Sequence, residues 1–290
     1  MQAASRSRLA GFLAVNAAAM VFGAAALFAR LDVPIVWIVA GRAGFAALTL
    51  AFLAVALRVP LRPARAHAIT LAWTGALLAA HWLTFFWAVR LAGVAVGTLT
   101  MAAFPLFTIL IESARAGRRP TVVEISAGVA ILVAVSVLVR PGIAGTHVIL
   151  GALIGLASAA GFSLFGLATQ RLAREVHSVP LVLFQNAVCA VVLLPALLLV
   201  APPSPTQLFA IALLGIIATA LVHQLYLFGL KRLPAAVCGA IVSLEPVYAI
   251  VFAAALFGEA IDAAVIASAA LIVGASLLLL RWQTVPAAVA

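Results

Sequence analysis

The stretch of sequence that decides the fold is His223–Glu259, which reads HQLYLFGLKRLPAAVCGAIVSLEPVYAIVFAAALFGE. An earlier stretch, His81–Arg118, reads HWLTFFWAVRLAGVAVGTLTMAAFPLFTILIESARAGR and shares its apolar frame. Residues recur at a nearly constant spacing: His81, Arg90 and Gly97 return 142 residues later as His223, Arg232 and Gly239, and Pro105, Gly117 and Arg140 return 141 residues later as Pro246, Gly258 and Arg281. The chain therefore contains an internal repeat, and we expect its two copies to occupy residues 1–145 and 146–290.

The composition excludes a water-soluble domain. Of the 290 residues, 67% are hydrophobic and 8% are charged, and the mean hydropathy is +1.30. Apolar segments of about 20 residues recur along the chain, as in polytopic helical membrane proteins. The net charge of +10 comes from basic residues in short loops, so membrane topology explains it and no nucleic-acid partner is expected. The predicted fold is an all-α polytopic membrane protein whose solvent is the lipid bilayer.

Ten transmembrane helices are predicted, five in each copy of the repeat. Their approximate ranges are 9–29, 33–57, 67–91, 94–112, 121–139, 147–170, 179–201, 206–230, 234–257 and 261–281. Because five is an odd number, the second copy enters the membrane from the side opposite to the first, which makes this a 5+5 inverted repeat. The loop charges agree, since the basic loop around Arg118 and Arg119 aligns with a loop that carries the acid Glu259.

The distribution of basic residues predicts that both termini are cytoplasmic. In that orientation the inside loops hold 13 basic residues: Arg6, Arg8, Arg58, Arg62, Arg65, Arg115, Arg118, Arg119, Arg171, Arg174, Lys231, Arg232 and Arg281. The outside loops hold Arg30, Arg90 and Arg140. The expected location is the inner (plasma) membrane, as a monomer or a weak homodimer.

Metal, cofactor and disulfide chemistry is not expected. Cys189 and Cys238 both lie inside predicted spans, so a disulfide framework is not indicated. The five histidines are scattered and no His-x3-His or Cys-x2-Cys spacing occurs.

Inverted repeats are associated with alternating access, because two related halves can exchange conformations. The alternative is a duplicated scaffolding protein of the membrane. A channel is a further alternative, since broken helices and a polar lining suit it as well. An intramembrane serine protease with a Ser163–His223 dyad is a weaker one, because Leu164 follows the serine where a tight oxyanion turn would favour glycine. We therefore expect a transporter of a small molecule and not an enzyme.

A family resemblance supports this expectation. The segments Leu244-Glu245-Pro246-Val247-Tyr248 and Leu256-Phe257-Gly258-Glu259, with the ten predicted spans and the five-plus-five duplication, resemble the EamA branch of the drug/metabolite transporter superfamily. Within that branch the chain is most similar to the aromatic amino acid exporters. The resemblance implies export of small metabolites, most of all aromatic or hydrophobic amino acids, through a central cavity.

The repeat also predicts where the substrate binds. Pro105 and Pro246 occupy equivalent mid-span positions, where each would free backbone polar groups for a ligand or only kink the helix for packing. His81 and His223 form a second equivalent pair, and each is expected to bind substrate or to make an interhelical hydrogen bond. Glu245 would attract a substrate ammonium group or relay a proton, or it would be a buried acid capped by backbone.

Arg42, in the second span, would bind a substrate carboxylate or extend to the membrane interface. Its counterpart region in the seventh span contains Gln185 and Asn186, so both spans are expected to line the cavity. The full predicted substrate-binding set is Arg42, His81, Phe85, Met101, Pro105, Phe162, Gln185, His223, Tyr226, Glu245, Pro246 and Tyr248.

Overall fold

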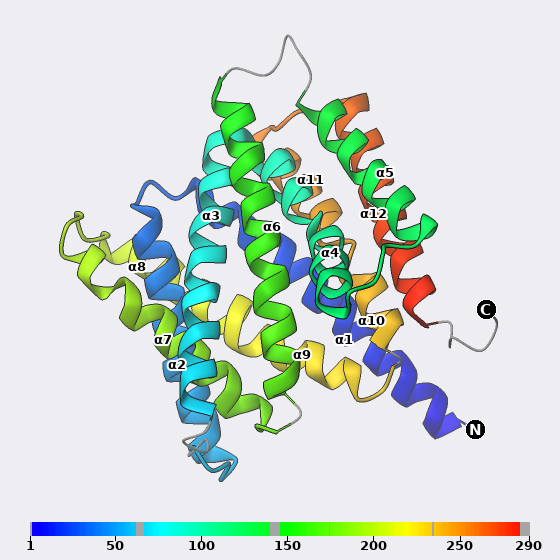
Figure 1. Ribbon diagram of the computed structural model, residues 1–290. Helices are drawn as coiled ribbons and strands as arrows, with labels where there is room; N and C mark the ends of the chain where they lie inside the picture. Colours follow the sequence, from blue (N-terminus) through cyan, green and yellow to red (C-terminus); the bar gives the residue numbers. More distant parts are fainter. Residues whose placement is uncertain (1, 62–66, 140–145, 174, 234, 285–290) are drawn as a thin grey trace.

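The computed structural model describes residues 2–61, 67–139, 146–173, 175–233 and 235–284, and within these it contains helices and no strand. The elements are α1 (Gln2–Ala26), the 3₁₀ segment η1 (Leu27–Arg30), α2 (Ile35–Ala56), α3 (Ala68–Met101), α4 (Phe104–Ala116), α5 (Val122–Leu138), α6 (Thr146–Leu172), α7 (Ser178–Leu197), α8 (Pro205–Gly215), the π-helical segment η3 (Ile216–Leu221), α9 (Val222–Leu230), α10 (Ala235–Val242), α11 (Glu245–Phe257) and α12 (Ala263–Thr284). They form one bundle (Figure 1).

Six helical stretches in the described residues are long and apolar enough to cross a membrane: Arg6–Arg30, Ile35–Ala56, Ala68–Met101, Thr146–Leu172, Ser178–Leu197 and Pro205–Gly229. Three shorter apolar helices accompany them: Val122–Leu138, Glu245–Phe257 and Ala263–Leu279. The all-α, polytopic membrane class is therefore confirmed, whereas the count of ten spans stays a prediction. Arg62, Arg65, Arg140 and Arg174, on which the predicted orientation partly rests, and the segment 140–145 beside the predicted domain boundary lie outside the described residues.

A turn at Gly93 divides α3 into two helical segments. Gly93 has φ 85° and ψ 168°, a conformation that L-residues with a side chain rarely adopt. The chain folds back so tightly that a Cβ on Gly97 would lie 2.8 Å from the Cα of Val89. This turn coincides with the predicted connection between the third and fourth spans.

The two predicted mid-span prolines do not lie within continuous helices, which corrects the prediction for the spans 94–112 and 234–257. The second segment of α3 ends at Met101 and α4 begins at Phe104, while α10 ends at Val242 and α11 begins at Glu245. Pro105 and Pro246 occupy the first turns of α4 and α11. Proline is well tolerated there because its missing N–H would have no helical partner in any case.

The two proline-initiated helices have the same construction. Each is 13 residues long, and each ends at a glycine in the left-handed conformation, Gly117 with φ 62° and Gly258 with φ 66°. Left-handed glycine is a common helix terminator because it lacks the Cβ that would clash there.

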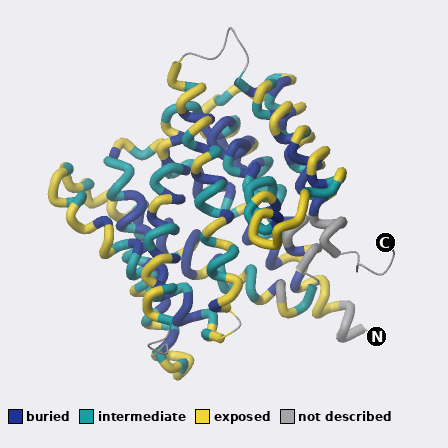
Figure 2. The backbone as a smooth tube through the Cα atoms, in the orientation of Figure 1, coloured by how far each residue is buried: buried dark blue, intermediate teal, exposed yellow. Residues whose placement is uncertain are grey.

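Helix packing is reciprocal between the two halves of the chain. The main partners include α3 with α6, α1 with α9, α1 with α11, α4 with α6, α2 with α7, α3 with α7, α2 with α8, and α5 with α12. The predicted repeat relates each helix of the first half to a helix of the second half. Under this relation the α3–α6 contact corresponds to the α1–α9 contact, and the α4–α6 contact corresponds to the α1–α11 contact. Buried residues follow the helix faces turned toward the middle of the bundle (Figure 2). The halves are interlocked and do not sit side by side.

Candidate functional site

Arg42 on α2 is the centre of a buried polar cluster. Its side chain is 4% exposed, and Nε donates a hydrogen bond of 3.0 Å to Oγ1 of Thr219. Cζ lies 3.9 Å from the centroid of the Trp82 ring and 5.7 Å from that of Phe86. These cation–π contacts are favourable when desolvated. The alternative that Arg42 extends to the membrane interface is therefore wrong, because aromatic faces and a hydroxyl hold it inside the bundle.

The π-helical segment η3 presents Thr219 to Arg42. The Thr219 hydroxyl donates to the carbonyl of Leu214, five residues earlier, at 3.1 Å, which leaves its lone pairs for Arg42. Gly215 allows this approach, because a Cβ there would lie 2.6 Å from the carbonyl oxygen of Arg42 and 2.7 Å from the Cβ of Phe45. Thr219 was missed by the sequence analysis, since no residue pattern distinguishes a π-turn from an α-turn. π-Helical turns are often found at functional sites.

The two predicted histidines make similar hydrogen bonds. Nδ1 of His81 lies 3.1 Å from the carbonyl oxygen of Ser158 on α6, and Nδ1 of His223 lies 2.6 Å from that of Thr219. A carbonyl oxygen only accepts, so Nδ1 of His223 carries the proton and Nε2 of the neutral ring is an acceptor. Nδ1 of His81 also lies 2.9 Å from the Ser158 hydroxyl, which can donate or accept. The interhelical hydrogen bond expected as one alternative for His81 is thus present, and it leaves Nε2 for other use.

Each histidine ring contacts a phenylalanine from the opposite half of the chain. The centroids of His81 and Phe162 are 4.9 Å apart, and those of His223 and Phe22 are 5.4 Å apart. Since Phe22 and Phe162 are 140 residues apart, the two contacts correspond under the repeat. A hydrogen bond also joins the two halves here, because the Ser163 hydroxyl donates to the carbonyl of Phe104 at 2.7 Å.

Aromatic side chains continue from His81 along α3, α4 and α6. Phe85 lies 6.2 Å from His81 between ring centroids, and Phe104 packs edge-on against Phe162 at 5.1 Å. Met101, at the last position of α3, packs against the same apolar core as Phe85. Phe85 and Phe162 therefore lie in one aromatic cluster around His81, whereas Met101 is placed only in the apolar core that contains Phe85.

Glu245 is the acid of the cluster. It occupies the first position of α11, directly before Pro246, and the close approach of Gly23 brings α1 within van der Waals distance of this turn. The charge of Arg42 interacts electrostatically with Glu245, His81 and His223. No salt bridge among the described residues joins Arg42 to Glu245. The structure thus places a buried cation and a half-buried acid in one region without a salt bridge between them.

The remaining predicted residues lie elsewhere. Gln185 on α7 is buried and donates to Oγ1 of Thr169 on α6 at 2.9 Å. The Tyr248 hydroxyl donates to Oδ1 of Asn16 at 3.4 Å, and Tyr226 packs in the same small core as Tyr248. Gln185 thus contacts α6, Tyr248 contacts α1, and Tyr226 belongs to a small core with residues of α1 and α10.

One end of the bundle is tied by polar contacts. The Glu259 carboxylate pairs with Arg30 and accepts a hydrogen bond of 3.2 Å from the backbone N–H of Val94. The Arg90 guanidinium donates to the carbonyls of Ala29, Leu31 and Val33 at 2.8 to 3.0 Å. These contacts fasten η1, the Gly93 turn and the α11–α12 connection to one another.

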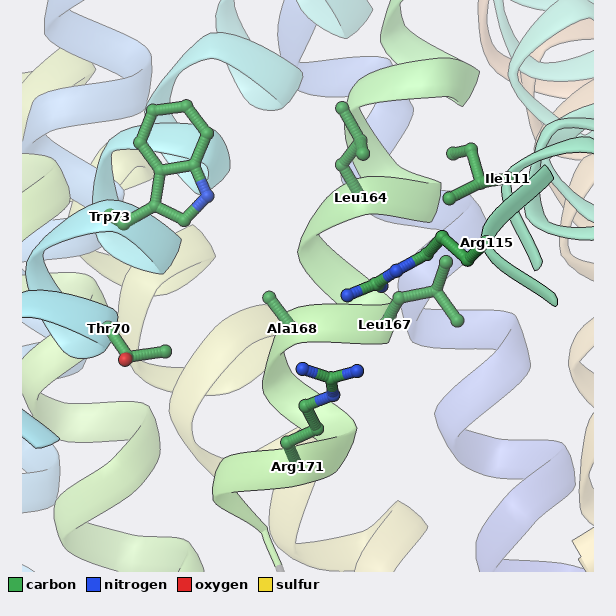
Figure 3. A pocket seen from close by; sticks show the side chains of 8 residues that line it. All are labelled: Thr70, Trp73, Ile111, Arg115, Leu164, Leu167, Ala168 and Arg171. Carbon is green, nitrogen blue, oxygen red and sulfur yellow. The ribbon is translucent and has the colours of Figure 1, made fainter. Parts of the chain in front are cut away.

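The opposite end contains a cavity of about 280 Å³. Its lining residues are Thr70, Trp73, Ile111, Arg115, Leu164, Leu167, Ala168 and Arg171 (Figure 3). None of the predicted substrate-binding residues lines it, so the sequence analysis did not anticipate this space. At this end, Arg118 pairs with the nearby Glu124 through two hydrogen bonds of 2.8 and 2.7 Å.

The protease alternative finds no support in the hydrogen bonding. The Ser163 hydroxyl donates to backbone carbonyls, Phe104 at 2.7 Å and Ala159 at 2.9 Å, and Nδ1 of His223 is bonded to Thr219. Ser163 and His223 share no hydrogen bond among the described residues. Three or more potential metal ligands do not come together anywhere in that part of the chain either.

Comparison with known proteins identifies an EamA-like transporter family domain at residues 149–281. A solved crystal structure is similar over 97% of this chain and 99% of its own, with a TM-score of 0.64 and 20% sequence identity. At this identity the likeness establishes the fold, and it extends over both halves of the chain. No curated protein matches the chain. The matched region, which covers most of the second half of the chain, is similar to EamA-like transporters.

Proposed function

We propose that the protein is an inner-membrane exporter of aromatic or other hydrophobic amino acids, which works by alternating access. The observation that carries the proposal is the unpaired arrangement of Arg42 and Glu245 beside an aromatic cluster. A zwitterionic amino acid has a carboxylate for Arg42, an ammonium group for Glu245 and a ring for Phe85, Phe104 and Phe162. Such a ligand would complete the pairing that the protein leaves open.

Reciprocal packing supports a 5+5 inverted repeat as the basis of the transport cycle. In our proposal, exchange of the two halves' conformations moves the opening from one face of the membrane to the other. The contacts of His81 with Phe162 and of His223 with Phe22 would interchange roles in the two states. In this arrangement the N-terminal turn of α11 would face the substrate, and its helix dipole would favour the ionised Glu245 carboxylate that binds the ammonium group.

The proposed orientation has both termini in the cytoplasm. The end tied by Glu259 then faces outward, and the end with Arg115, Arg118 and Arg171 faces inward, in agreement with the excess of basic residues expected there. The conformation described here would be closed to the outside, because its polar ties lie at the outer end.

The charge roles can be tested with truncated ligands in proteoliposomes. L-Phenylalanine, 3-phenylpropionate, which lacks the ammonium group, and phenethylamine, which lacks the carboxylate, would compete against uptake of labelled L-phenylalanine. Glu245→Gln should weaken competition by L-phenylalanine and phenethylamine at least tenfold while 3-phenylpropionate is little affected. Arg42→Gln should show the converse pattern. Equal losses for all three ligands in both variants would contradict the assignment of separate charge partners.

A channel predicts a different result in the same vesicles. A channel conducts without saturation, and its flux is not accelerated by unlabelled substrate on the opposite side. Saturable uptake with counterflow would exclude the channel, whereas a linear concentration dependence would favour it.

A further inference from the structure

The cavity at the Arg171 end is an elongated groove on the surface of α6. Leu164, Leu167, Ala168 and Arg171 follow an i, i+3, i+4, i+7 spacing, so they form one stripe along about 10 Å of helix. Trp73 on α3 borders the stripe on one side, and α4 borders it on the other (Figure 3). Trp73 is 58% exposed and Leu164 is 42% exposed. In a membrane protein such apolar surface faces acyl chains, so the groove is open to the bilayer.

Two guanidinium groups stand at the polar end of this apolar groove. The Arg115 and Arg171 side chains point into the same space from α4 and α6 (Figure 3). Both residues are exposed, and neither has a hydrogen bond or ion pair among the described residues. A second cavity, of about 550 Å³, adjoins the groove and shares Arg115, Leu167 and Arg171 with it.

The nearby Arg118 differs from Arg115 and Arg171 because its guanidinium group is already paired with Glu124. Its two hydrogen bonds to Glu124 satisfy the guanidinium group and raise the pKa of Arg118. Glu112 is the acid that lines the adjoining cavity, and no salt bridge in the described part of the chain ties it to Arg115 or Arg171. The charge available to a ligand in the groove is therefore that of two free arginines.

We propose that this groove binds an anionic phospholipid of the surrounding bilayer, with the phosphate between Arg115 and Arg171 and an acyl chain along Leu164 and Trp73. Arginine suits phosphate because its planar donors match the phosphate oxygens. Basic pockets between transmembrane helices near the cytoplasmic surface are typical sites for anionic headgroups. The proposal is independent of the substrate assignment, since none of the residues around Arg42 takes part in it.

Fluorescence quenching in vesicles of defined composition tests the proposal. The protein would be reconstituted in phosphatidylcholine vesicles that contain the same fraction of either dibrominated phosphatidylglycerol or dibrominated phosphatidylcholine. The quenching lost in Trp73→Phe measures the contribution of Trp73, and Trp87→Phe gives a matched control from the same helix, because Trp87 is 53% exposed. We expect Trp73 to be quenched at least twofold more by the anionic lipid, and Trp87 to be quenched equally by both lipids.

Variants and a soluble competitor then identify the ligand. Arg115→Gln combined with Arg171→Gln should remove the excess quenching of Trp73, whereas Arg118→Gln should retain it. Equal quenching of Trp73 by the two lipids, or an excess that persists in the double variant, would overturn the proposal. Loss of the excess on addition of millimolar inorganic phosphate at constant ionic strength would also overturn it, because the site would then be one for free phosphate.

Discussion

Gly215→Ala is the perturbation that tests most sharply how the buried cluster is assembled. The added methyl group would lie 2.6 Å from the carbonyl oxygen of Arg42 and 2.7 Å from the Cβ of Phe45. These are a backbone atom and the first side-chain atom, so neither yields without movement of α2. Overpacking of this kind costs about 1–3 kcal/mol, and the higher helix propensity of alanine offsets up to about 1 kcal/mol of it. Because both contacts are shorter than 3.0 Å, the cost lies at the upper end of this range, and the expected net loss of unfolding free energy is about 2 kcal/mol.

The chain supplies both an assay and a control for this prediction. Cys189 and Cys238 are free and buried, so a thiol-reactive fluorophore reports thermal unfolding in detergent without any introduced cysteine. Gly44→Ala lies on α2 two residues from Arg42, where no atom comes within 4 Å of the added Cβ. Gly215→Ala should unfold at a lower temperature than the wild type, and Gly44→Ala should not. If both variants unfold at the same temperature, the close packing of the α8–η3 junction on α2 is refuted.

Three further predictions concern the contacts around this cluster. Ser158→Ala removes the hydroxyl that donates to the His81 carbonyl at 3.0 Å, and it should lower the unfolding free energy by about 0.5–2 kcal/mol. The control variant Ser136→Ala loses only a hydrogen bond to its own helix and should lower the unfolding free energy less. The thiol assay measures both variants. Thr219→Val should reduce L-phenylalanine uptake at least fivefold while Thr219→Ser retains it, because only the hydroxyl accepts from Arg42; equal uptake by both variants would refute that role. Glu259→Gln weakens the ion pair with Arg30. In a background without the native cysteines, it should speed the labelling of Ala26→Cys by an impermeant maleimide, because Ala26 is fully buried in this conformation. An unchanged labelling rate would contradict a role of the Glu259–Arg30 pair in closing the outer end.

The repeat made a large part of the candidate site predictable. Because His81 and His223 were recognised as equivalent, their related positions beside phenylalanines of the opposite half follow from an inverted duplication. The roles of Arg42 and Glu245 as partners of a substrate carboxylate and ammonium group stay predictions. Spacing and residue type were sufficient here, since polar groups inside a membrane must face a partner or a cavity.

Other features depend on backbone geometry that residue type does not reveal. Pro105 predicted a kink, but the helix breaks before it, because proline at the first turn of α4 needs no hydrogen-bond partner for its nitrogen. Thr219 was missed because the π-helical turn that directs it toward Arg42 has no sequence signal. Arg115 and Arg171 were interpreted only as orienting charges, and their convergence on one groove follows from the packing of α4 against α6.

The measurement that tests the central claim most directly is counterflow in proteoliposomes with a panel of aromatic and aliphatic amino acids. The account predicts saturable uptake of labelled L-phenylalanine that is accelerated when the vesicles are preloaded with unlabelled aromatic amino acid, and loss of this acceleration in Arg42→Gln. Flux that rises linearly with concentration, and that no preloaded amino acid accelerates, would contradict a carrier built from two interlocked halves.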